Sequence, residues 1–80
     1  MDRNTGEILI RVGLNVAYYR KLRNWNQEEL SERAKLSRTL ISNIEAPNMF
    51  TNPTLSTLIN IAKALQIPPA KLLEIKDENF

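Results

Sequence analysis

The chain has 80 residues and a formal net charge of +2 at pH 7, and this length fits one small domain. It contains no histidine and no cysteine, which excludes disulfide bonds, thiolate metal sites and the usual general base of an enzyme. The composition therefore argues against an enzyme, a bound metal and a cofactor.

The sequence also lacks the features of a membrane or secreted protein. No apolar run approaches the length of a membrane span, and the first residues, MDRNTGE, contain no signal-peptide core. We therefore expect a soluble, cytoplasmic protein that does not associate with a membrane.

Positive charge is concentrated in one part of the chain. Residues 11–38 contain seven lysines and arginines and three glutamates, for a net charge of +4, whereas residues 1–10 and 39–80 each carry −1. A basic surface attracts a polyanion such as DNA. The alternative, that charges clustered along the sequence are dispersed in space, stays open at this point.

The first predicted element is a helix that begins at about Ile8, after a flexible arm of residues 1–7. Its apolar side chains have the three- and four-residue spacing of one helix face, and they are Ile8, Val12, Val16, Tyr19 and Leu22. Gly13 falls within this helix, where glycine costs about 1 kcal/mol relative to alanine. We expect Gly13 to mark either the close approach of another helix or a helix start nearer Val12.

Residues 26–45 are predicted to form two short helices joined by a tight turn. Asn26 is a favourable N-cap for the first helix, and Glu29 three residues later supplies part of a capping box. Lys35 and Leu36 form the turn, and Ser37 caps the second helix. The rest of the chain is expected to be organised around this two-helix unit.

The second of these helices has two different faces. At 100° per residue, its apolar side chains fall on one side, formed by Leu40, Ile41 and Ile44. The opposite side has hydrogen-bonding side chains and no carboxylate, namely Arg38, Thr39, Ser42 and Asn43. These side chains suit base edges in the major groove, where Arg pairs with guanine and Asn with adenine. The alternative is an ordinary solvated face, although such a face usually mixes glutamate with lysine.

The remainder of the chain adds a loop and two further helices. The prolines and asparagines of residues 46–53 indicate the loop. Thr54 caps a fourth helix, whose inward face consists of Leu55, Leu58, Ile61, Ala62 and Leu65. A short fifth helix starts at Pro69 and carries Leu72, Leu73 and Ile75. Residues 77–80 form a frayed tail, so the predicted domain is an all-α five-helix bundle over residues 8–76.

With these five helices placed, the chain resembles the helix-turn-helix family of phage Cro and repressor proteins, also called the XRE family, over about Val12 to Leu73. The residues that carry the resemblance are Val16, Tyr19, Arg20, Gln27, Glu28, Glu29, Leu30, Ala34, Leu36, Ser37, Ile41, Ser42, Asn43, Ile44 and Glu45, then TNPTLSTLINIAKAL and PAKLL. The resemblance implies a compact five-helix bundle of the lambda-repressor-like DNA-binding type. Ser31 and Lys35 depart from the family pattern, which has alanine and glycine there. The loop after Glu45 also lacks the family's glycine-containing pair, which leaves its contacts with phosphate open.

The resemblance implies a role for individual residues of the two-helix unit. The residues implied to contact DNA phosphates are Asn26, Gln27, Lys35 and Ser37. Those implied to read bases are Arg38, Thr39, Ser42 and Asn43. Arg20 and Glu45 match the family's internal ion pair, which ties the first helix to the end of the recognition helix.

The expected function is sequence-specific binding of double-stranded DNA by a transcriptional regulator without a small-molecule substrate. One recognition helix reads only a few base pairs, so we expect a homodimer on a palindromic operator. The apolar residues available to a dimer interface are Leu72, Leu73, Ile75 and Phe80, although the first two can instead close the core. The alternative function is a protein-interaction module, such as an antitoxin or a regulator antagonist, with a regulatory protein as its partner. Salt-sensitive retention on nonspecific duplex DNA distinguishes DNA binding from that alternative.

Overall fold

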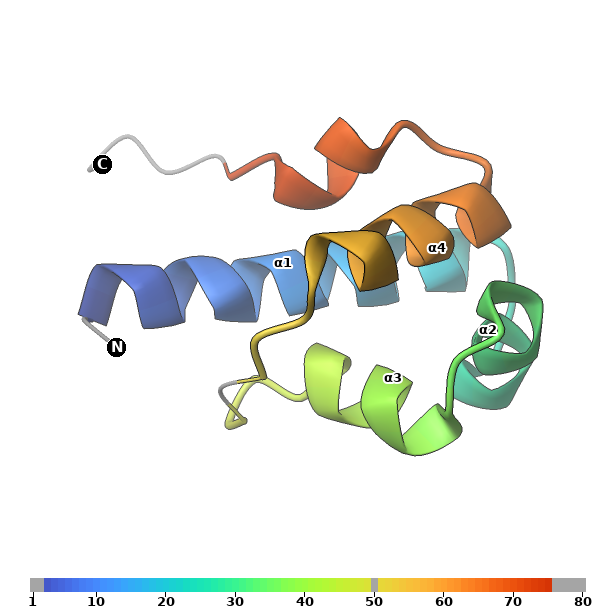
Figure 1. Ribbon diagram of the computed structural model, residues 1–80, viewed down its shortest axis with the longest axis horizontal. Helices are drawn as coiled ribbons and strands as arrows, with labels where there is room; N and C mark the ends of the chain where they lie inside the picture. The colour runs from blue at the N-terminus through green and yellow to red at the C-terminus, as the bar shows by residue number, and fades with distance from the viewer. Residues whose placement is uncertain (1–2, 50, 76–80) are drawn as a thin grey trace.

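The structure is a computed structural model that describes residues 3–49 and 51–75. Four α-helices, α1 (Arg3–Leu22), α2 (Gln27–Ala34), α3 (Arg38–Glu45) and α4 (Leu55–Leu65), are followed by a 3₁₀ helix, η1 (Pro69–Leu73). In Figure 1, α1 lies along the middle of the molecule, with α3 on one side of it, η1 on the other and α2 near one end. The described part of the chain is entirely helical apart from its connecting segments.

Every helix contributes at least one fully buried apolar side chain to a single core. These side chains are Val16 from α1, Leu30 from α2, Ile41 from α3, Ile61 and Leu65 from α4, and Leu72 from η1. Burial of each such side chain contributes about 1.5–3 kcal/mol. The positions of the short helices α2 and α3 are therefore set by packing against the rest of the bundle, because helices of this length are marginal on their own.

α1 begins at Arg3, before the predicted start at Ile8. Residues 3–7 were expected to belong to the flexible arm and are helical, so the predicted boundary is wrong. The apolar stripe marks where a helix meets the core, whereas residues 3–5 of the first turn are exposed. That turn has an ion pair at helical spacing, with Arg3 Nε 3.2 Å from Glu7 Oε1. Residues 1–2 of the predicted arm and the predicted tail, residues 77–80, lie outside the described residues.

The predicted fifth helix is a 3₁₀ helix of five residues, Pro69–Leu73, so the five-helix prediction is wrong in this detail. The element begins at the second of two adjacent prolines and has no side-chain cap, and 3₁₀ helices occur in short pieces of this kind. Asn15 of α1 holds it in place, because Asn15 Nδ2 donates to the backbone oxygens of Leu72 and Glu74, each at 3.0 Å.

α4 has the predicted cap but not the predicted first core residue. Thr54 Oγ1 accepts a hydrogen bond from the N–H of Thr57 at 3.1 Å. The buried residues of α4 are Leu58, Ile61, Ala62 and Leu65. Leu55 shares their helical stripe yet is 64% exposed, because it is the first residue of the helix and lies beyond the edge of the core.

Gly13 marks the close approach of α1 to α3. A β-carbon at Gly13 would overlap the backbone carbonyl oxygen of Ile44, near the end of α3. The other expectation, a helix start nearer Val12, is wrong because α1 already begins at Arg3. The two helices therefore meet backbone to backbone, beside Glu45.

We expect Gly13→Ala to destabilise the domain by about 1–2 kcal/mol. The overlap with a backbone atom outweighs the roughly 1 kcal/mol by which alanine is favoured over glycine in a helix. Leu14→Ala is the control, since Leu14 is the next residue of α1 and is 48% exposed. Urea denaturation measures both changes. A Gly13→Ala domain as stable as the parent would show that α1 and α3 do not pack this closely.

Candidate nucleic-acid interface

Side-chain caps fix the starts of α2 and α3. Asn26 Oδ1 accepts a hydrogen bond from the N–H of Glu29 at 2.8 Å, and Glu29 Oε1 accepts one from the N–H of Asn26 at 3.0 Å. This is a complete capping box, of which the sequence pattern indicated one part. Ser37 Oγ accepts the N–H of Leu40 at 3.0 Å. Each helix start presents oriented N–H groups and the positive end of a helix dipole, both of which attract phosphate.

The turn between α2 and α3 places a cation where the family pattern has glycine. Lys35 is in the left-handed conformation, with φ 58° and ψ 43°. The N–H of Leu36 donates to the backbone oxygen of Ser31 at 2.9 Å and closes the turn. A left-handed conformation costs a residue with a β-carbon about 1–2 kcal/mol. The Lys35 side chain is exposed in the turn between the two helices, where the sequence analysis expected it to contact phosphate.

The two faces predicted for α3 are present. Ile41 and Ile44 are buried and Leu40 is half-buried against the core. The four predicted base-reading residues are accessible, because Arg38 and Thr39 are exposed and Ser42 and Asn43 are half-buried. α3 therefore presents hydrogen-bonding groups to the solvent, as reading base edges requires.

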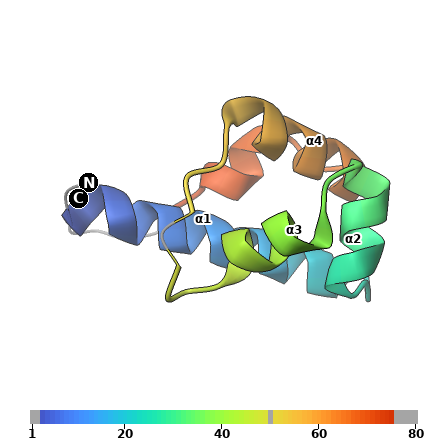
Figure 2. The ribbon, with the colours of Figure 1, turned by 60° about the horizontal axis from the view of Figure 1, so that its bottom comes forward.

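A shallow hollow brings the starts of α2 and α3 together. Its volume is about 350 Å³, and it is lined by Arg20, Asn26, Gln27, Glu28 and Arg38. Two predicted phosphate-contacting residues thus lie beside a predicted base-reading residue. In Figure 2, α2 and α3 form one angled unit joined by their short turn. A duplex whose groove receives α3 would pass its backbone close to the start of α2.

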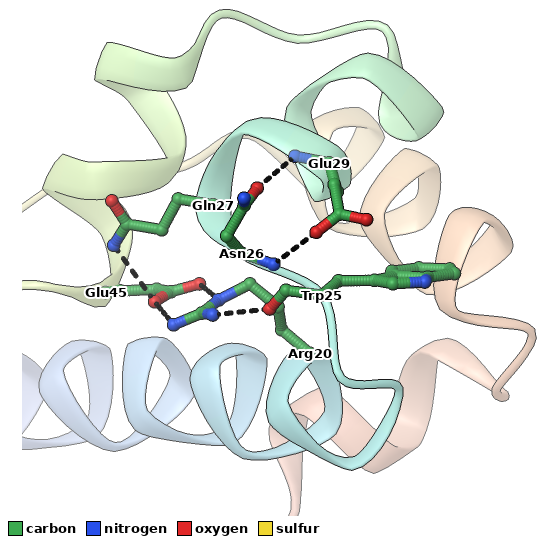
Figure 3. Close-up of polar contacts among 6 residues, drawn as sticks. All are labelled: Arg20, Trp25, Asn26, Gln27, Glu29 and Glu45. Atoms are coloured by element: carbon green, nitrogen blue, oxygen red, sulfur yellow. Dashed lines mark hydrogen bonds and ion pairs between the residues drawn. The ribbon is translucent and has the colours of Figure 1, made fainter.

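The expected Arg20–Glu45 pair lies beneath this hollow and joins α1 to the end of α3. Arg20 Nε and Nη2 each donate to a different oxygen of Glu45 at 2.8 Å. The side chains are 11% and 5% exposed, so the pair is largely shielded from water. Arg20 Nη1 also donates to the backbone oxygen of Trp25 at 2.7 Å, as Figure 3 shows. The hydrogen bond to Glu45 raises the pKa of Arg20 above its ordinary value and keeps the guanidinium charged.

Gln27 has a contact that the sequence analysis did not anticipate. Its Nε2 donates to Glu45 Oε1 at 3.2 Å, and the residue is half-buried. In Figure 3, the Gln27 side chain points from the start of α2 toward the Arg20–Glu45 pair. The residue that the family resemblance assigns to phosphate is therefore bonded within the protein here. Eighteen residues separate Gln27 from Glu45, and no local pattern indicates the contact.

The described residues contain neither a metal-binding cluster nor a membrane-spanning helix. Residues 3–49 and 51–75 contain no group of three or more aspartates and glutamates positioned to hold a metal ion. None of their helices has the length and apolar character needed to cross a membrane.

Comparison with known proteins gives related sequences. A family model described as "Helix-turn-helix" matches residues 16–72. The control protein C.SmaI of Serratia marcescens is 48% identical over 59 residues, which cover 74% of this chain and 68% of that protein. The transcriptional regulator SinR of Bacillus licheniformis is 33% identical over 67 residues, which cover 84% of this chain and 60% of SinR. The chain thus spans less than two thirds of the length of this SinR.

Solved structures show the same arrangement of helices. The N-terminal DNA binding domain of SinR from Bacillus subtilis has a TM-score of 0.74 and 31% identity, covering 84% of this chain and 96% of that one. The restriction-modification controller protein C.AhdI of Aeromonas hydrophila has a TM-score of 0.75 and 26% identity, and the match covers 80% of this chain and 94% of that one. The sequence match and the shared fold agree with the capped two-helix unit and the polar face of α3. This chain belongs to the XRE-type helix-turn-helix family.

Proposed function

We propose that this protein is a cytoplasmic, sequence-specific DNA-binding transcriptional regulator that reads the major groove with α3 and has no catalytic activity. The polar face of α3 carries the proposal, because its four hydrogen-bonding residues are accessible and no carboxylate lies among them. Arg38 and Asn43 would make bidentate contacts with guanine and adenine, and Thr39 and Ser42 would adapt to either. The relatives that are control or regulator proteins support the same class of function.

The phosphate contacts would come from residues around the hollow and the turn. Asn26 and Ser37 lie at the starts of α2 and α3, and Lys35 is an exposed cation between the helices. Gln27 would reach phosphate only by giving up its hydrogen bond to Glu45. Because Glu45 keeps both bonds to Arg20, this exchange leaves the buried carboxylate paired. These contacts would hold the register of the protein on DNA without reading its sequence.

We propose further that the protein binds as a homodimer. One α3 contacts only a few base pairs, and two copies related by a two-fold axis would read a palindrome. Leu72 is fully buried and closes the core, whereas Leu73 is 49% exposed although it is the next residue of η1. Ile75 is half-buried beside it. Exposed apolar groups at this end of the chain support an interface with a second copy.

Selection from a pool of random duplexes tests the proposed function. We expect the parent protein to enrich an inverted repeat whose half-sites lie about one DNA turn apart. The mass of the complex with the selected duplex, measured by sedimentation, should then correspond to two protein chains for each site. Enrichment of a single short site bound by one chain would overturn the dimer and leave base reading intact. Two results together would overturn DNA reading itself: no sequence is enriched from the pool of duplexes, and the protein instead binds a partner protein with an affinity that does not depend on salt.

Binding of a regulatory protein is a second candidate function. The supporting observation is the structural likeness to a chain of the SinR–SinI complex, with a TM-score of 0.76 and 30% identity, covering 86% of this chain and 66% of that one. That likeness gives no surface on this chain for such a partner.

A further inference from the structure

The C-terminal halves of α2 and α4 form a groove with an uneven distribution of charge. This α2–α4 groove has a volume of about 290 Å³ and is lined by Arg33, Ala34, Lys35, Asn60, Lys63 and Ala64. Three of the six side chains are cations and none is an acid. All three cations are exposed, and none forms an ion pair with any carboxylate of the described residues. Such a surface attracts an anionic partner.

The residues that line the α2–α4 groove suit a peptide. Ala34 is buried and Ala64 is half-buried, so the two smallest side chains form the floor between longer charged ones. Asn60 supplies an amide that can donate to a peptide carbonyl and accept from a peptide N–H. Arg33 is held in place, because its guanidinium carbon lies 4.2 Å from the centre of the Trp25 ring. A fixed guanidinium loses less conformational entropy when it binds a carboxylate.

The surroundings of the groove favour a protein partner over nucleic acid. Figure 3 shows the Trp25 ring, on which Arg33 stacks, extending away from Gln27 and Glu45. Glu32 is an exposed residue of α2 that lines neither this groove nor the hollow at the starts of α2 and α3. Its carboxylate would disfavour a duplex that extended along α2 from that hollow to the groove. An acidic segment that binds only the groove does not have to cover Glu32.

From these observations we infer that the α2–α4 groove binds an acidic segment of a partner protein. The carboxylates of the segment would pair with Arg33, Lys35 and Lys63, and its backbone would bond to Asn60. This surface extends the second candidate function. It does not depend on base reading by α3, and the two can fail separately.

Amide chemical shifts on titration with an octaglutamate peptide test this inference. We expect shifts at residues 33–35 and 60–64 that diminish as salt is raised to about 0.5 M. The double variant Arg33→Gln/Lys63→Gln should lose these shifts. Lys21→Gln/Lys71→Gln removes two exposed charges elsewhere and should retain them. Both double variants should keep the parent's preference for its selected duplex.

Three results obtained with the parent protein would overturn the inference. The first is the absence of groove shifts in the parent. The second is shifts confined to residues 38–43, which would show that the peptide merely follows the DNA-reading face. The third is an equal perturbation of residues 60–64 by nonspecific duplex DNA, which would assign Lys63 to nucleic acid. A perturbation at Lys35 alone is expected from its proposed phosphate contact. If Arg33→Gln perturbs folding through Trp25, the single variant Lys63→Gln should still weaken the shifts, and unchanged shifts there would also count against the inference.

Discussion

Glu45→Leu is expected to destabilise the domain by about 3–5 kcal/mol. Glu45 is 7% exposed and accepts hydrogen bonds from both Arg20 and Gln27. Without the carboxylate, the Arg20 guanidinium stays in a shielded site where its one remaining partner is the backbone oxygen of Trp25. A charge left this way has lost most of its hydration without compensation. Because Glu45 is the last residue of α3, the same change should loosen the end of that helix.

A double-mutant cycle measured by urea denaturation tests this pair. The cycle consists of Arg20→Met, Glu45→Leu and both changes together. The double variant has no unpaired charge at this buried site, so we expect it to be more stable than Glu45→Leu alone. The exposed pair Arg3–Glu7 is the control, and Glu7→Ala should change stability by less than about 1 kcal/mol. A coupling energy of zero between Arg20 and Glu45 would contradict the structural role of the pair.

The features that the sequence predicted correctly are those set by local chemistry. Asn26, Ser37 and Thr54 cap the helices that they were expected to cap, because a side-chain oxygen next to unpaired N–H groups has few alternatives. The two faces of α3 follow from helical periodicity, and its buried face meets the core. The turn at Lys35 was found although glycine is absent there. The positions of the predicted base-reading residues follow from these elements.

The features that the sequence did not predict depend on where the core ends and on distant contacts. Apolar spacing shows which side of α1 or α4 faces the core but not how far the helix or the core extends. The start of α1 was therefore predicted too late, and Leu55 was wrongly assigned to the core. The choice between an α-helix and a 3₁₀ helix after Pro69 depends on hydrogen-bond geometry over a single turn. The Gln27–Glu45 contact joins two helices that come together only in the folded chain.

Arg38→Ala and Asn43→Ala should each weaken binding to the cognate site by about 1–3 kcal/mol and relax the preference at one base position. Both side chains lie on the accessible face of α3, and both can make two hydrogen bonds to one base. Gln27→Ala should instead weaken binding to every sequence alike, because a phosphate contact conveys no base information. The alternative for Arg38 is a contact with the backbone alone, since a cation near a helix start reaches phosphate easily.

The ratio of specific to nonspecific affinity, at one fixed salt concentration, tests base reading by α3 most directly. Salt must be fixed because phosphate contacts make both affinities depend on it. Lys21→Ala, at an exposed cation of α1, is the control, and each variant is first shown to be folded. We predict that the ratio falls about 5- to 150-fold in Arg38→Ala and in Asn43→Ala, and stays at the parent value in Gln27→Ala and Lys21→Ala. If the ratio of specific to nonspecific affinity in both Arg38→Ala and Asn43→Ala equals that of the parent protein, base reading by this face of α3 is contradicted.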